Sequence, residues 1–172
     1  SHNSGKIHEI AALFECYPFK VSSAKTYDLP EPNETENTFA GNAILKAHTT
    51  AMALQKPALA DDSGLVIPAL NGNPGIFSAR WAGPDRDFNL AMQKVHSSLE
   101  GANTSDRNAH FICALALVWP DSHEEVFEGR INGSTVWPAR GKNGFGYDPI
   151  FVAEGYALAF GEMGAEAKLA IS

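Results

Sequence analysis

The sequence is poor in cysteine and has no long apolar run. Its two cysteines, Cys16 and Cys113, lie far apart in the 172 residues and in no metal-ligand spacing, which argues against a disulfide framework or a cysteine zinc site. The longest apolar run, "HFICALALVW", falls well short of the ~18 residues that cross a bilayer. No secretory signal is visible. We therefore expect a cytoplasmic protein with reduced thiols and no membrane partner.

Basic residues are also scarce: 13 Lys and Arg face 20 Asp and Glu, a net charge of −7. This balance argues against a general nucleic-acid binder, which needs a basic surface. A phosphorylated small molecule stays possible if the few basic residues converge and a cation helps. None of the six histidines pairs at metal spacing, so we interpret four of them as surface or packing residues: His48, His96, His110 and His123.

Length and hydrophobic content predict one domain, residues 1–172, with a substantial core. Helical spacing of apolar residues predicts helices over 5–17, 39–54 and 84–100, with Thr38 as a cap, and another helix near Ala165. Strands are predicted at 19–24, 110–119 and 124–133, and a strand–turn–strand at 57–70. Helices interleaved with strands indicate an α/β or mixed α+β domain.

The first candidate site is "SHNSGK", which leads directly into the first predicted helix. Unpaired N–H groups at a helix N-terminus bind anions, and Gly5 lets the backbone approach a ligand. Lys6 is unfavourable for the helix itself, which a bound phosphate would explain. Ile7 excludes a Walker A loop. The alternative is plain N-capping by Asn3 or Ser4 with a solvated lysine.

The second candidate site is acidic: Glu34 in "NETENTF" and the neighbours Asp61 and Asp62 in "ALADDSGL". Mg²⁺ takes one or two carboxylates and completes its shell with water and phosphate oxygens. A nearby carboxylate can also deprotonate an attacking water. The alternative is that one aspartate satisfies a turn made by Ser63-Gly64. Spacing alone does not separate the two.

The third candidate site is the loop "GKNGFGYDP", residues 141–149. Its glycines allow close backbone approach, and Phe145 or Tyr147 could stack on a purine base. An ordinary hairpin connection has the same composition. Arg80 in "FSARW" is a weaker candidate, which could bind phosphate, stack on Trp81 or pair with Asp85.

Taken together, "SHNSGKIHEI", "ETENTFAGNAILKA", "ALADDSGLVIPALNGNPGIFSAR", "GKNGFGYDPIF" and "FGEMGAEAKLAIS" resemble the inosine triphosphate pyrophosphatase family over nearly the whole chain. The resemblance implies a two-lobed α/β domain around a long, twisted mixed sheet, with the nucleotide in a cleft between the lobes, and a homodimer. It implies Mg²⁺-dependent hydrolysis of ITP, dITP or XTP to the monophosphate and pyrophosphate. A relative acting on other modified nucleotides, or a nucleotide-binding protein with little catalysis, is the alternative.

The resemblance also assigns residues. Glu34 and Asp62 would hold Mg²⁺, and Asp62 would accept the proton of the attacking water. The remaining assigned residues would bind the substrate, with its triphosphate at residues 1–6 and its base and sugar at residues 145–148. The full set is Ser1, His2, Asn3, Ser4, Gly5, Lys6, Lys46, Ser63, Phe145, Gly146, Tyr147, Asp148 and Lys168.

The sequence departs from the family at two places. Members usually carry an acidic residue shortly after the "TF" pair, where this chain has Ala40 and Gly41. A lost carboxylate would weaken metal binding or water positioning, and Glu34 or Glu36 could compensate. The chain also stops at Ser172, where the family continues with a His-Arg pair that reads the base, and it lacks a short leading strand. We expect trimmed ends.

Overall fold

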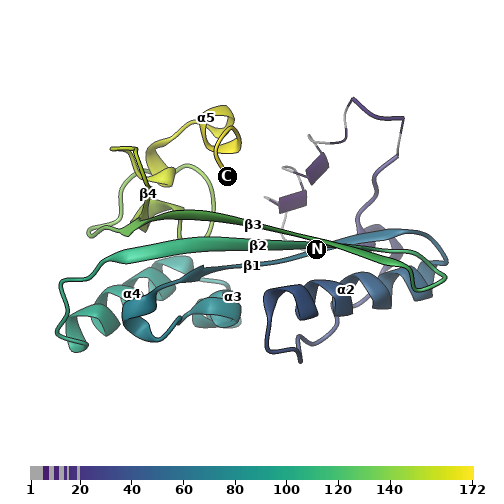
Figure 1. Cartoon of the computed structure of the whole chain (residues 1–172), viewed down its shortest axis with the longest axis horizontal. Helices are drawn as coiled ribbons and strands as arrows, with labels where there is room; N and C mark the ends of the chain where they lie inside the picture. The colour runs from purple at the N-terminus through teal and green to yellow at the C-terminus, as the bar shows by residue number, and fades with distance from the viewer. Residues whose placement is uncertain (1–5, 8–9, 12–13, 15, 19) are drawn as a thin grey trace. The chain divides into compact units, whose positions relative to one another are not determined.

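The computed structural model describes residues 6–7, 10–11, 14, 16–18 and 20–172. Strand β1 spans Ala58–Val66, β2 spans Asn108–Val118, β3 spans Glu124–Thr135 and β4 spans Phe151–Ala153. They form one sheet in the order β1-β2-β3-β4 (Figure 1). Thr135 of β3 lies opposite Phe151 of β4 in an antiparallel register. None of the described helices is both long and apolar enough to cross a membrane.

The predicted α/β class is confirmed, with one difference in the sheet. The described strands form an antiparallel sheet rather than a mixed one. The reason is clearest at β2 and β3: their connection, in which Trp119 N–H bonds to His123 C=O, is too short to join parallel strands. A mixed sheet would need a parallel strand, which the described residues do not contain.

The chain divides into two compact units, each described by itself. Unit 1 contains the residues up to Asp62 together with Ala114–Glu128. Its core lies under helix α2 (Phe39–Leu54), where Ala43, Ala47 and Ala51 are fully buried. Alanines at this spacing form one narrow face of the helix. They pack on alanines and a valine of β1 and β2, so the predicted apolar face of this helix is confirmed.

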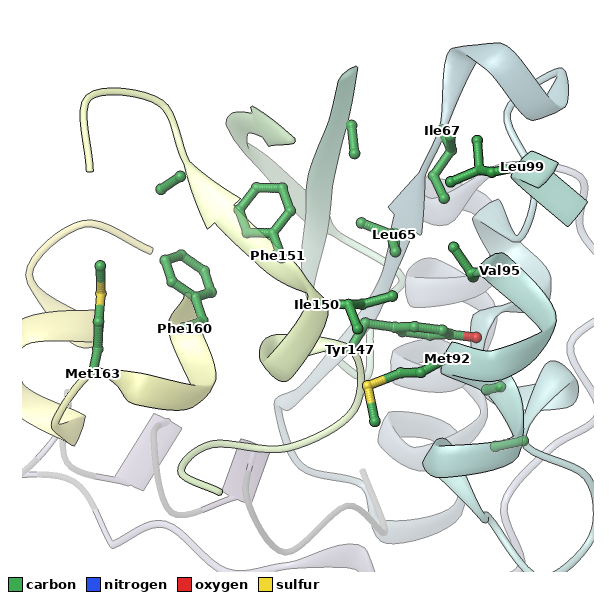
Figure 2. Close-up of a cluster of buried hydrophobic side chains, with 14 residues drawn as sticks. Leu65, Ile67, Met92, Val95, Leu99, Tyr147, Ile150, Phe151, Phe160 and Met163 are labelled. Atoms are coloured by element: carbon green, nitrogen blue, oxygen red, sulfur yellow. The ribbon is translucent and has the colours of Figure 1, made fainter. Parts of the chain in front are cut away.

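Unit 2 contains Ser63–Cys113 and Gly129–Ser172. Helices α3 (Ser78–Trp81) and α4 (Phe88–Gly101) lie on the β1 side of the strands, and β4 and α5 (Ala165–Leu169) on the β3 side (Figure 1). Its core combines both sides, and Figure 2 shows Tyr147 and Ile150 next to α4, with Phe151 and Phe160 beyond them. Asp87 caps α4 by accepting from Asn89 N–H.

Two local predictions are wrong. The segment 20–23 is irregular and is followed by the 3₁₀ helix η1 (Ala24–Tyr27), where a strand was predicted. Ser23 caps η1 by accepting from Lys25 N–H, a local bond that competes with strand pairing. The predicted strand–turn–strand is one continuous strand, β1, followed by the 3₁₀ helix η2 (Pro68–Leu70). Ser63 and Gly64 are therefore extended, because pairing with β2 overrides their turn preference.

Candidate active site

The paired carboxylates of the sequence lie on a strand. Because β1 is continuous through Asp61 and Asp62, their side chains leave on opposite faces. Both are buried, with 8% and 6% of their surface exposed. Asp61 lies 3.8 Å from the ammonium of Lys6. Asp62 accepts a hydrogen bond of 3.2 Å from Asn42 Nδ2 and one of 3.4 Å from Lys46 Nζ. The turn alternative for this pair therefore does not hold.

Helix α2 supplies both partners of Asp62. Thr38 caps the helix by accepting from Gly41 N–H at 3.0 Å, which confirms the predicted start. Asn42 and Lys46 follow at a spacing of four residues, which places them on one helix face. The Asn42 amide is fully buried, and its Oδ1 also accepts from Glu36 N–H. Its two bonds fix which side of the amide points to Asp62.

Lys46 joins two acidic side chains. Its Nζ donates to Glu34 Oε1 at 2.7 Å as well as to Asp62 Oδ1 at 3.4 Å. Burial alone would lower the pKa of Lys46, but the hydrogen bond to Glu34 and the charges of Asp62 and Glu34 outweigh it and raise that pKa above its ordinary value. Lys46 is therefore a permanent cation.

Asp62 differs from an ordinary surface aspartate. Burial raises its pKa; Lys46 attracts its charge and lowers that pKa again, and the nearby Glu34 carboxylate raises it further. The net pKa of Asp62 lies above the usual aspartate value because burial, together with the Glu34 charge, outweighs the attraction of Lys46. A carboxylate with a raised pKa holds a proton more strongly, which suits a proton acceptor.

The same cluster carries an excess of negative charge. Glu34 and Asp62 contribute two negative charges and Lys46 one positive charge, a net charge of −1, whereas Asp61 pairs with Lys6. The described part of the chain contains no group of three His, Cys, Asp or Glu side chains placed to enclose a metal. The Glu34 and Asp62 carboxylates instead meet at the Lys46 ammonium, and a Mg²⁺ site takes only one or two carboxylates from a protein before water and substrate oxygens complete its shell.

Gly41 is enclosed by its neighbours. A Cβ at this position would lie 2.8 Å from Glu36 Cβ and 2.9 Å from Thr38 Oγ1, closer than side chains pack. Glu36 thus occupies the space where a side chain at position 41 would begin. Its carboxylate lies 3.5 Å from the Thr35 hydroxyl and is exposed, so it is not one of the groups that contact Lys46.

A second cluster lies in unit 2, around the loop of residues 141–149, which is predicted to bind the base and is called the base loop here. Asp148, 3% exposed, accepts from Lys168 Nζ at 2.8 Å and from Phe145 N–H at 2.8 Å. The Lys168 ammonium also lies 4.2 Å from the centre of the Phe145 ring, within cation–π range. Gly144, with φ +74°, is required because Asp148 Oδ2 fills the place of its Cβ. Phe145, Asp148 and Lys168 therefore form one rigid group.

The loop has a deep side and an open side. Tyr147 is 2% exposed, and its ring lies in the core beside Met92 and Ile150 (Figure 2). Phe145 instead borders a cavity of about 390 Å³ that the start of α4 closes with Phe88 and Met92. An aromatic ring at the edge of a cavity can stack on a planar ligand. Phe145, not Tyr147, thus has the placement of a stacking residue.

Not all of the candidate residues belong to these two clusters. Ser1, His2, Asn3, Ser4 and Gly5 lie outside the described residues. Lys6 lies in a helical segment, and Ser63 follows Asp62 on β1. The guanidinium of Arg80 lies 5.0 Å from the ring of Phe77.

Sequence reasoning missed the buried contacts of Asn42 and Ser78. Asn42 had a signal, its spacing of four residues from Lys46, but nothing local identified Asp62 as its partner. Ser78 had no signal in the sequence. Its partners, Leu65 and Tyr147, lie 13 and 69 residues away in the chain.

Comparison with known proteins places this chain in a family. The sequence model of the Ham1 family matches residues 1–172. The chain belongs to the Ham1 family. It is 57% identical to the dITP/XTP pyrophosphatase of Caulobacter vibrioides, over all of this chain and 88% of that protein. It is 53% identical to the protein of the same name from Rhodospirillum centenum, over 100% of this chain and 85% of that one.

A solved Ham1 structure has the same fold. The HAM1 protein from Coxiella burnetii superimposes with a TM-score of 0.93 at 41% identity, covering 100% of this chain and 88% of that one. The family predicted from the five sequence motifs is thus confirmed. A cleft between two lobes stays a prediction.

Proposed function

We propose that this Ham1 protein hydrolyses ITP, dITP and XTP to the monophosphate and pyrophosphate, with Mg²⁺ as cofactor. The observation that carries the proposal is the buried Asp62, held by Asn42 and Lys46 in a chain 57% identical to a dITP/XTP pyrophosphatase. Such activity removes deaminated purines from the nucleotide pool.

The reaction follows from the groups in unit 1. A water oxygen attacks the α-phosphorus, the bond from that phosphorus to the bridging oxygen breaks, and pyrophosphate leaves. Asp62 accepts the proton of the water, for which its raised pKa suits it. Asn42 fixes the orientation of the carboxylate. Glu34 and Asp62 would hold Mg²⁺, which would supply positive charge for the triphosphate. Lys46 and Lys6 add two more positive charges to the anionic substrate.

The group of Phe145, Asp148 and Lys168 in unit 2 binds the base. The purine stacks on Phe145, whose backbone Asp148 holds and whose ring lies against the Lys168 ammonium. A donor facing the 6-oxo group of inosine or xanthine would stay unpaired with adenine, which costs about 1–3 kcal/mol of discrimination. Ser1 to Gly5 would complete the triphosphate site. We also expect the protein to be cytoplasmic and to form a homodimer. Its molar mass in solution tests the dimer.

The direct test is pyrophosphate release from ITP, dITP, XTP, GTP and ATP, with Mg²⁺ and with EDTA, using a chain extended at both ends as in its relatives. Rapid, metal-dependent release from the first three and slow release from GTP and ATP is the expected result. Equal rates on all five would contradict the selectivity, and release in EDTA would contradict the metal requirement.

Gly41 favours a second candidate, a nucleotide-binding protein with little catalysis. The position where relatives of this kind usually have a carboxylate carries none, and Glu36 fills the adjoining space. This candidate predicts ITP binding in calorimetry with no pyrophosphate released from any of the five nucleotides. Glu34 and Asp62, which converge on Lys46 without help from position 41, favour the enzyme.

A further inference from the structure

Ser78 fastens a short helical segment to the edge of β1. Its hydroxyl accepts from Leu65 N–H at 3.0 Å and donates to Gly75 C=O at 2.7 Å. Both roles of the hydroxyl are therefore used, and Ser78 is buried. An isolated bridge between Val66 and Pro74 covers the same edge of the strand. The "PGIFSAR" segment thus completes hydrogen bonds at an edge where β1 has no further partner strand among the described residues.

Tyr147 fastens the base loop to the same residue. Its hydroxyl donates to the backbone C=O of Ser78 at 2.8 Å, and its ring meets Phe88 edge-on at 5.4 Å between centres. Burial raises the pKa of Tyr147 well above its ordinary value, so the hydroxyl keeps its proton and stays a donor. A buried bond of this kind would leave an unsatisfied carbonyl if the donor were lost.

The hydrogen bonds of Ser78 and Tyr147 lie next to positions that the proposed function uses. Ser63, the proposed substrate contact, lies two residues before Leu65 on β1. Tyr147 lies between Gly146 and Asp148 of the loop that presents Phe145. The path from Ser63 through Leu65, Ser78 and Tyr147 to the base loop runs entirely within unit 2 and contains only buried hydrogen bonds and short stretches of chain.

We propose that Ser78 and Tyr147 are positioning residues, which hold the base loop at a fixed distance from Ser63 on β1. The proposal rests on the proposed function. A nucleotide that is bound at its base reacts at its α-phosphate. The distance between the base loop and Ser63 therefore decides whether the phosphorus lies within reach of the attacking water. Misplacement by about 1 Å can cost up to 100-fold in rate while leaving the base contacts intact.

Tyr147→Phe tests this most cleanly because it removes one hydroxyl and keeps the ring. Tyr156→Phe is the matched control, an exposed tyrosine of the same unit. With ITP and Mg²⁺, we expect kcat of Tyr147→Phe to fall about tenfold, with KM and the inhibition constant of inosine monophosphate within twofold of the parent. Ser78→Ala should lower kcat by a similar factor. The double variant should lose about tenfold rather than a hundredfold, because either change breaks the same link.

The alternative is a purely structural role. It predicts a loosened base loop, so KM and the inosine monophosphate inhibition constant would rise together while kcat stayed near that of the parent, and this result would overturn the proposal. Losses that multiply in the double variant would overturn it as well. Rates are compared at a temperature where thermal unfolding shows every variant folded, and if Ser78→Ala does not fold, Tyr147→Phe decides alone. A parent that releases no pyrophosphate would reject the proposed function instead.

Discussion

Replacing Gly41 by alanine tests how tightly the start of α2 is packed. Helix propensity alone predicts a gain of about 1 kcal/mol, because alanine is the best helix former and glycine among the worst. The structure predicts the opposite sign. The new Cβ would lie 2.8 Å from Glu36 Cβ and 2.9 Å from Thr38 Oγ1. Glu36 Cβ is bonded directly to the backbone, so the backbone of the preceding loop has to move.

The size of the loss follows from two contributions. Forcing one methyl group into packed surroundings costs about 1–3 kcal/mol. Displacing Thr38 also weakens its cap on Gly41 N–H, and a lost cap costs about 1 kcal/mol. Set against the propensity gain, these contributions give a net destabilisation of about 1–3 kcal/mol for Gly41→Ala.

Urea unfolding measures the effect, with Gly101→Ala as the matched control. Gly101 ends α4 and has open space around its Cβ position, so alanine there should change the free energy of unfolding by a gain of at most about 1 kcal/mol. In a Glu36→Gly background, which removes the closest atom, the loss caused by Gly41→Ala should shrink by about 1 kcal/mol. A stabilised Gly41→Ala protein would refute the packing argument.

Two further predictions concern buried charges. Lys168→Met leaves the Asp148 carboxylate buried without its cation and should lower the free energy of unfolding in urea by about 3–5 kcal/mol. Arg140→Met removes a more exposed and longer ion pair and should lower it by under about 1 kcal/mol. Equal losses in the two variants would contradict this prediction. Burial and the charge of Arg130 lower the pKa of His110, so the unfolded chain takes up the proton first and stability should fall as the pH drops below about 6.5 towards that lower pKa. His110→Gln should reduce this slope between pH 7.5 and 5.5, and an unchanged slope would assign it to other groups.

The sequence was informative where a periodic pattern coincided with burial. The alanines of α2 recur every four residues, and the helix that they predict is present with Thr38 as its cap. The β1 segment shows the limit of such reasoning. Ser63-Gly64 has the composition of a turn, yet pairing with β2 keeps it extended. Composition records local preference, and the partner strand is 40 and more residues away.

The candidate site shows the same division. Glu34, Lys46 and Asp62 were predicted from family motifs, and the structure brings their charged groups together. The roles of Asn42 and Ser78 could not be predicted, because each depends on a partner fixed by tertiary structure: Asp62 for the first, Leu65 and Tyr147 for the second. A side chain that orients another residue leaves no pattern of its own in the chain.

The central claim is that Asp62 accepts the proton of the attacking water. Single-turnover hydrolysis of ITP by Asp62→Asn, measured together with ITP affinity by calorimetry, tests it most directly. Asparagine keeps the size of the side chain and removes the proton acceptor, so we expect the rate to fall at least about 100-fold while the protein stays folded and its Kd for ITP changes less than about tenfold. A variant that retained more than about a tenth of the parent rate would contradict the account.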